Sequence, residues 1–187
     1  MHFPTTTTLL AAAALAPLAA AVPATPPIWA PRLNAVAVHK SGGFKDMILT
    51  EIRTNTLRTS NGTDDNRQIS FHLADANFNT TTTCTKTWYE TYNTSTTRPG
   101  SYMACKANAG VKESYRWFFD SYTSLGEFGL QLAHAYSDPV NYPPPWDVVG
   151  LFATVNITLG CAEGKGGKEC ALKEGESVRA PINGAVN

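Results

Sequence analysis

The chain has 187 residues, with 15 Lys and Arg against 15 Asp and Glu, so its formal net charge is zero and its pI is about 6.9. Only 16% of the residues are charged, which argues against a protein that binds nucleic acid or an anionic membrane, because such proteins carry a basic surplus. The 43% hydrophobic and 10% aromatic content excludes an intrinsically disordered chain and predicts one domain with an ordinary core.

The chain begins with features of a secretory signal peptide, which we assign to residues 1–24. The run Leu9–Val22 is apolar and Ala-rich, but it is too short to cross a bilayer, which takes about 20 residues. Small residues follow, and we expect cleavage after Ala24. Residues 25–44 are rich in proline and read as an N-terminal extension before the folded domain.

Seven segments of the following domain, residues 45–175, are predicted as β-strands. In chain order they are Met47–Thr54, Ile69–Leu73, Thr82–Glu90, Ser101–Lys106, Lys112–Asp120, Glu127–Tyr136 and Val149–Gly160. Several alternate between apolar and polar residues, which is the period of a half-buried strand, and turn-forming clusters separate them. Seven short strands without a helical stripe predict an all-β fold, a single compact antiparallel barrel or sandwich.

Two stretches late in the domain are predicted as loops. Asp138–Trp146 contains four prolines, which forbid a central strand, and Ala162–Lys173 is rich in Gly, Lys and Glu. Residues 176–187 are expected to form a C-terminal tail, and their lack of a hydrophobic stretch argues against a GPI anchor.

Four cysteines follow the signal peptide, an even number that allows three disulfide connectivities. Proximity in the sequence favours Cys84 with Cys105 and Cys161 with Cys170. Neither a CxxC pair nor an HxxxH spacing accompanies them, so we do not expect a zinc site or any other metal or cofactor. Two disulfides would indicate an oxidising compartment, and we therefore expect a secreted, extracellular protein.

Four Asn-x-Ser/Thr sequons agree with passage through the secretory pathway and predict a glycoprotein. Their asparagines are Asn61, Asn79, Asn93 and Asn156. The alternation of the last predicted strand places Asn156 on its outward face, where a glycan can be accommodated.

The order of these strands and the two local cysteine pairs resemble the Alternaria major-allergen-like secreted β-barrels of filamentous fungi. The resemblance extends from about Met47 to Cys170. Its carriers are the strand Met47–Arg53, the segment Gln68–Asp75, Cys84, Trp88, Cys105, the aromatic strand Tyr115–Phe119, the segment Phe128–Tyr136, and the strand that runs into Cys161.

The resemblance implies an effector-like or allergen-like protein without an established catalytic centre. Members of that family are described as binding plant defence proteins of the thaumatin-like class, small phenolic ligands, or both. The chain departs from the family in the proline-rich stretch before Trp146. It also lacks the extra cysteine through which some members form covalent dimers, so we expect a monomer or a non-covalent dimer.

Three functions are consistent with the sequence. The favoured one is a non-enzymatic binding protein that acts on a host extracellular protein, with Trp146 as candidate partner-binding residue because tryptophan is a frequent interface anchor. The alternatives are a carrier of a small apolar or phenolic ligand and a secreted hydrolase. For the hydrolase, Glu113 and His134 lie at inward positions of two strands and form a conceivable acid/base pair, but a core histidine satisfied by a hydrogen bond is the simpler interpretation. We therefore expect no catalytic residue.

Overall fold

The structure is a computed structural model that describes residues 43–58, 64–91, 99–108, 113–164 and 167–187. Residue contacts divide the chain into two units, Met1–Pro31 and Arg32–Asn187, and all described residues belong to the second. The predicted signal peptide, most of the predicted extension, and the sequon residues Asn61 and Asn93 lie outside the described residues.

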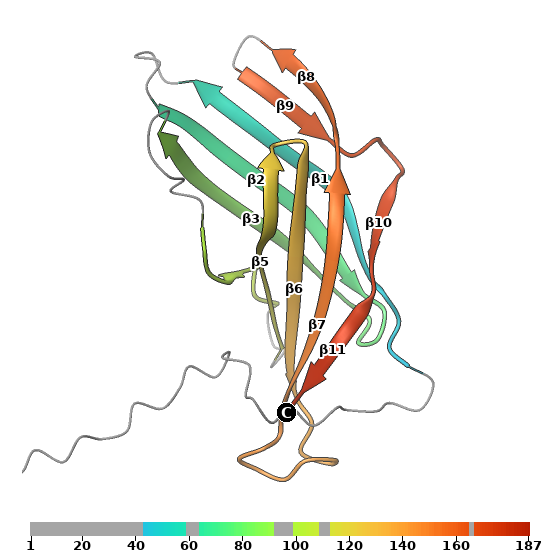
Figure 1. Cartoon of the computed structure of the whole chain (residues 1–187). Helices are drawn as coiled ribbons and strands as arrows, with labels where there is room; N and C mark the ends of the chain where they lie inside the picture. The colour runs from blue at the N-terminus through green and yellow to red at the C-terminus, as the bar shows by residue number, and fades with distance from the viewer. Residues whose placement is uncertain (1–42, 59–63, 92–98, 109–112, 165–166) are drawn as a thin grey trace, which may run out of the picture. The chain divides into compact units, whose positions relative to one another are not determined.

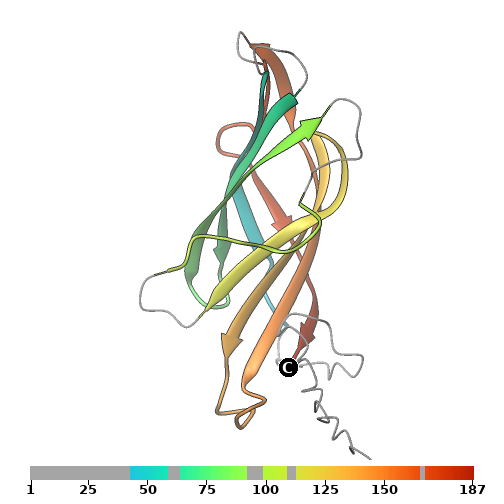
Figure 2. The same cartoon turned by 90° about the vertical axis from the view of Figure 1, so that its left-hand side faces the viewer.

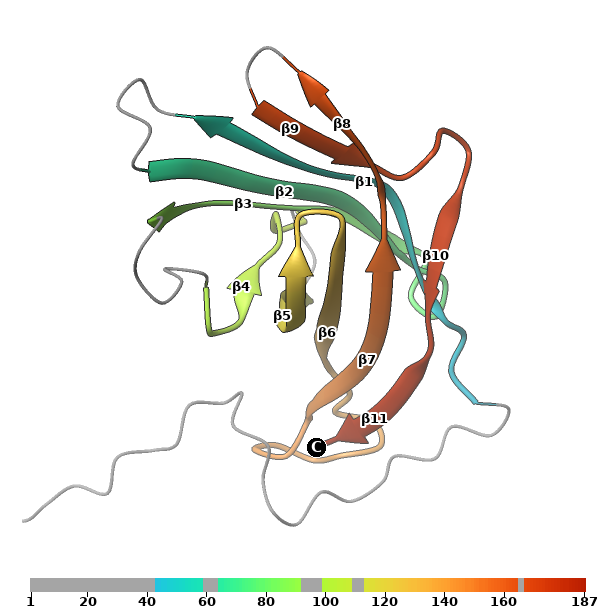
Figure 3. The ribbon, with the colours of Figure 1, turned by 45° about the horizontal axis from the view of Figure 1, so that its top comes forward.

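The described residues form two antiparallel β-sheets and no helix (Figure 1). The six-stranded sheet consists of β1 (Met47–Arg58), β2 (Asp64–Asp75), β3 (Thr80–Thr91), β8 (Gly160–Gly164), β9 (Gly167–Ala171) and β10 (Ser177–Ala180). The five-stranded sheet consists of β4 (Met103–Ala104), β5 (Ser114–Ser124), β6 (Glu127–Ser137), β7 (Val148–Thr158) and β11 (Ile182–Val186). The two sheets face each other as a sandwich and are not closed into a barrel, which decides between the two predicted architectures (Figures 2 and 3).

Strand β1 organises the six-stranded sheet because it has partners along both edges. One edge pairs with β2, and the other pairs first with β10, at Met47 opposite Ala180, and then with β9, at Arg53 opposite Ala171. The change of partner follows an irregularity at Glu51, whose φ of 52° lies in the left-handed region. Such a bulge bends the strand and re-aims the side chains that follow it.

The two sheets are joined along one side by chain segments that pass from one to the other. Strand β7 leads through Leu159 directly into β8, and β10 leads through Pro181 into β11, as Figure 3 shows. On the opposite side the Cys84–Cys105 disulfide links β3 to the residue after β4. The sandwich is therefore held by backbone continuity on one side and by a covalent staple on the other.

The interior between the sheets is filled with aromatic and aliphatic side chains. Trp117 is fully buried and meets Phe71 of the facing sheet edge-on at a ring-centroid distance of 5.4 Å. Trp88 meets Phe119 at 5.5 Å in the same manner. Edge-to-face aromatic pairs contribute about 0.5–1.5 kcal/mol beyond their buried area, so this chain of rings stabilises the contact between the sheets.

The seven predicted strands are confirmed in place, although several are longer than predicted and β4 is only two residues long. Both predicted disulfides are also confirmed, and no free cysteine lies among the described residues. The segment Asp138–Trp146 is a loop, as predicted.

The prediction of a loop over Ala162–Lys173 is wrong, because most of this segment forms the β8–β9 hairpin. Its Gly and Lys content favours turns, but Cys161 and Cys170 lie directly opposite each other in the hairpin and fix its register. The expected tail 176–187 also differs, since β10 and β11 lie within it and pair with β1 and β7. Tertiary pairing overrides the weak local preference in both segments.

Candidate functional site

The loop between β6 and β7, residues 138–147, is an ordered turn structure at one end of the sandwich, below the strands in Figure 1. The N–H of Asp138 donates to the carbonyl of Asp147 at 2.6 Å and closes the base of the loop. The N–H of Tyr142 donates to the Asp138 carbonyl at 3.0 Å, and the Trp146 N–H donates to a carbonyl within the proline-rich turn at 3.0 Å. The loop backbone is therefore organised before any partner arrives.

The same loop presents apolar side chains to solvent. Val140 is 91% exposed and Trp146 is 54% exposed, and Val148 at the start of β7 is 43% exposed. Trp146 also keeps a contact within the protein. Exposed apolar groups gathered on one loop are a usual feature of protein–protein contact sites. The structure thus places the predicted partner-binding residue Trp146 in an exposed position on an ordered loop.

A second arrangement, the buried polar cluster, consists of Asp75, Glu113 and His134. Nδ1 of His134 donates a 3.0 Å hydrogen bond to Oδ2 of Asp75, and both side chains are fully buried. Nε2 of His134 lies 3.3 Å from Oε2 of Glu113, but these two atoms lack the alignment of a hydrogen bond. The Glu113 side chain as a whole is 18% exposed. The pair Glu113 and His134 singled out from the sequence is thus brought together.

Aromatic rings enclose the buried polar cluster. The ring of Tyr115 stacks on that of His134 with centroids 4.2 Å apart, and Phe78 meets His134 edge-on at 4.5 Å. The Tyr115 hydroxyl hydrogen-bonds the Thr80 hydroxyl. The cluster joins the β2–β3 turn to β5 and β6, so it connects the two sheets at this end of the sandwich.

The electrostatics of the cluster follow from its burial and its hydrogen bonds. Burial acts to raise the pKa of Asp75, but the hydrogen bonds donated by His134 and by Asn77 outweigh it and hold the pKa below the ordinary value of 3.8. Burial also raises the pKa of the Tyr115 hydroxyl, and the charges of Asp75 and Glu113 raise it further, although the bond with Thr80 opposes them. The fully buried His134 ring has no route to a substrate atom without local opening.

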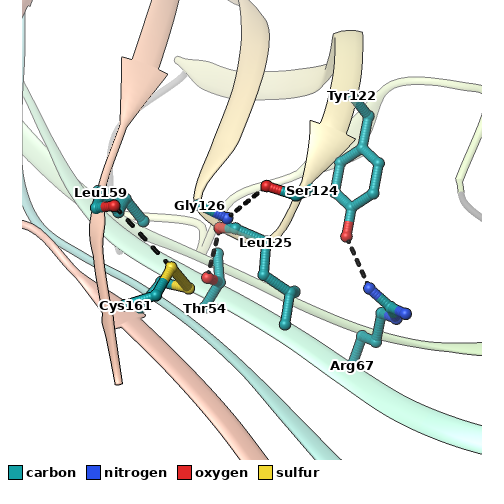
Figure 4. The surroundings of a disulfide bond; sticks show 9 residues. Thr54, Arg67, Tyr122, Ser124, Leu125, Gly126, Leu159 and Cys161 are labelled. Atoms are coloured by element: carbon teal, nitrogen blue, oxygen red, sulfur yellow. Dashed lines mark hydrogen bonds between the residues drawn. A yellow bond between two sulfur atoms is a disulfide. The ribbon is translucent and has the colours of Figure 1, made fainter. Parts of the chain in front are cut away.

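The β5–β6 turn makes another polar contact between the sheets, next to the second disulfide (Figure 4). The Thr54 hydroxyl on β1 donates to the Leu125 carbonyl at 2.7 Å, and the Leu159 N–H donates to the Gly126 carbonyl at 2.8 Å. A Cβ at Gly126 would lie 2.6 Å from Sγ of Cys161, so only glycine fits this close approach. The turn is thereby fixed against the Cys161–Cys170 staple.

The remaining predicted site residues lie on the surface. Asn156 is exposed on the outward face of β7, as predicted, and Asn79 is exposed in the β2–β3 turn. Sequence reasoning missed Asp75, the residue that holds His134. The available signal was an acidic residue directly after the inward stripe of β2, but the sequence could not show that this strand end meets β6.

Three comparisons with other molecules complete the description. No protein-family model, curated protein or solved structure matches the chain. Among the described residues, no group of three or more His, Cys, Asp or Glu side chains is arranged to hold a metal ion. The same residues include no helix of the length and hydrophobicity needed to span a membrane.

Proposed function

We propose that the chain is a secreted, non-enzymatic binding protein that acts on a host extracellular protein through its β6–β7 loop. The observation that carries this proposal is the exposure of Val140 and Trp146 on a loop whose backbone is internally hydrogen-bonded, with Val148 exposed directly after it at the start of β7. The two disulfides support the extracellular setting, since such bonds persist in oxidising compartments.

The order of the loop favours binding energetically. A segment that is already held by its own hydrogen bonds loses less conformational entropy when a partner immobilises it. Prolines 143–145 further restrict the backbone of the loop. Trp146 in such a setting is suited to fill a pocket of the partner. Replacement of tryptophan by alanine is among the substitutions that reduce the binding free energy of protein–protein interfaces most.

Two observations weigh against the alternative functions. A carrier of an apolar or phenolic ligand needs a hollow between its sheets, whereas Phe71, Trp117 and Phe119 occupy the centre of this sandwich. A hydrolase needs converging ionisable groups that a substrate can reach, whereas His134 is fully buried between Asp75 and the aromatic rings. Both observations support the binding protein.

The test is capture of a partner from host extracellular extract with the oxidised protein as bait, followed by affinity measurement with the purified partner. A defence protein of the thaumatin-like class is the first candidate, because the resemblance to the Alternaria allergen-like family implies it. Trp146→Ala should weaken binding by on the order of 2 kcal/mol, with little change in thermal midpoint.

The matched control is Tyr89→Ala, which truncates a similarly exposed aromatic side chain on the six-stranded sheet, 59% exposed against 54% for Trp146. With the partner stripped of its glycans, this variant should bind like the wild type. Equal affinities of the wild type and Trp146→Ala for the purified partner would contradict the proposal. A loss confined to Tyr89→Ala would place recognition on the sheet instead of the loop.

A further inference from the structure

A pocket of about 260 Å³ lies on the outer face of the six-stranded sheet, where β2, β1 and β9 run side by side. We call it the outer pocket. Its polar lining side chains are Arg53, Asn55, Gln68, Ser70 and Glu169. It is separate from the β6–β7 loop, which belongs to the other sheet.

The strand register explains why a hollow forms at this place. Two cross-strand rows of three residues lie next to each other, Ser70–Arg53–Ala171 and Gln68–Asn55–Glu169. The long side chain of Arg53 stands between the short side chains of Ser70 and Ala171, and this difference in length leaves space beside the guanidinium. The bulge at Glu51 sets this register, because the pairing of β1 with β9 begins after it.

The floor of the outer pocket is rigid. Thr54 and Cys170 also line it, and each is tied from the inner side. Thr54 is held by its bond to the Leu125 carbonyl, and Cys170 is held by its disulfide to Cys161, as Figure 4 shows for the surroundings of this staple. A ligand in the pocket therefore meets side chains carried by a fixed backbone, which is a requirement of a specific site.

The polar side chains of the outer pocket have no partner within the described part of the protein. None of the five makes a side-chain hydrogen bond or an ion pair there, although Arg53 and Glu169 carry opposite charges and line the same hollow. By contrast, Asn77 on the β2–β3 turn uses its amide to bond Asp75 and Lys45. The donors and acceptors of the outer pocket are thus available to a ligand.

The chemistry of the lining selects the class of ligand. Arg53 and Glu169 carry opposite charges, so a charged ligand gains from one and loses to the other, while an apolar ligand would displace water from five polar side chains without replacing its hydrogen bonds. A neutral polyhydroxylated ligand avoids each of these costs, because every hydroxyl both donates and accepts. Neighbouring hydroxyls also match the paired polar atoms of a guanidinium, an amide or a carboxylate.

We propose that the outer pocket binds a neutral saccharide. Its volume of about 260 Å³ lies just below the range of about 300–1,000 Å³ for drug-sized ligands, so it suits a single sugar ring. Tyr89 extends the site. Its side chain is 59% exposed on the same outer face of the sheet. Tyr89 lies two residues after Thr87 on β3, and Thr87 pairs with Gln68 of the pocket. A second ring of an oligosaccharide can stack its C–H face on this aromatic side chain.

The experiment is an array of neutral and acidic glycans probed with the full, oxidised protein, followed by calorimetric titration of the best neutral oligosaccharide and of its single-ring unit. Neutral glycans should be retained and anionic ones should not. Gln68→Ala and Arg53→Ala should each weaken the affinity by about tenfold or more, with unchanged thermal midpoints. Thr81→Ala, at an exposed position on β3 away from the pocket, is the matched control and should bind normally.

Tyr89→Ala separates the two parts of the site, because it should weaken the oligosaccharide and leave the single ring unaffected. Trp146→Ala should leave glycan binding unchanged, so failure of the saccharide proposal and failure of the loop proposal are distinguishable. The array should carry both free polysaccharide fragments and protein-linked glycans, and retention of only one class identifies the source. Absence of neutral binding, or binding that survives Gln68→Ala and Arg53→Ala, would overturn the proposal.

Discussion

Two polar clusters among the described residues have opposite character, the buried polar cluster between the sheets and the outer pocket on the six-stranded sheet. In the first, Asp75 and His134 are fully buried and bonded to each other. In the second, Arg53 and Glu169 are exposed and unpaired within the described residues. A polar group that is buried away from water costs free energy unless it bonds another protein group. A solvent-exposed polar group is hydrated and stays available to bind a ligand. Burial therefore separates the polar residues that maintain the fold from those available for recognition.

The largest expected effect comes from breaking the buried cluster. Asp75→Ala removes the carboxylate that accepts from Nδ1 of His134 and leaves the buried ring unpaired, so it should cost about 3–5 kcal/mol of folding free energy. Chemical denaturation of the two proteins measures the difference. The matched variant in the exposed cluster, Arg53→Ala, should change stability by no more than about 0.5 kcal/mol. Similar losses for both variants would remove the distinction between the clusters.

Removing the staple beneath the outer pocket should have the next largest effect. Replacing Cys161 and Cys170 together by Ala should lower stability by about 2–4 kcal/mol, mainly because the unfolded chain gains freedom. It should also weaken saccharide binding, since Cys170 lines the pocket. Thermal melts and the glycan titration measure the two effects. A destabilised variant that binds at full affinity would show that the staple does not organise the pocket.

Acid should weaken the buried cluster selectively. The pKa of Asp75 is lower in the folded protein than its ordinary value of 3.8. The stability that this carboxylate contributes is therefore present above 3.8 and is lost as the pH falls from there through the lower folded-state pKa. The loss is limited to the roughly 1.5–3 kcal/mol of a charge-assisted hydrogen bond. Unfolding curves should show a steeper decline below about pH 4 for the wild type than for Asp75→Asn. If the stability of both proteins falls equally with pH, carboxyl groups other than that of Asp75 are responsible for the acid sensitivity.

The smallest expected effect concerns the bond between the sheets beside the pocket. Thr54→Val keeps the side-chain shape but removes the donor to the Leu125 carbonyl, and it should cost about 1 kcal/mol. Denaturant midpoints compare it with Thr85→Val on the outer face of β3, which should be nearly neutral. If both variants behave alike, the Thr54 hydroxyl has no specific role in joining the sheets.

The sequence predicted the elements whose signal is local. Alternation along β6 and β7 identified both strands, and spacing was sufficient to pair Cys84 with Cys105. The β8–β9 hairpin was missed because its Gly, Lys and Glu residues have low strand propensity. They form strands only because β9 pairs with β1 and β8 pairs with β9. The same limit applies to both polar clusters. Asp75 and His134 belong to different sheets and meet only where the sheets pack together, whereas Arg53 and Glu169 are brought close only by the register of β1 with β9.

The double pairing of β1 has a consequence for the order of events during synthesis. This strand is the first described strand to leave the ribosome, yet one of its edges is completed by β9 and β10, which follow β8 in the chain order of the described strands. Until those residues emerge, the edge of β1 is open to pairing with other chains, and contacts between such distant segments form slowly. The nascent chain therefore depends on protection of this edge until β9 and β10 have been made, and a chain cut before Ser177 would keep part of it open permanently.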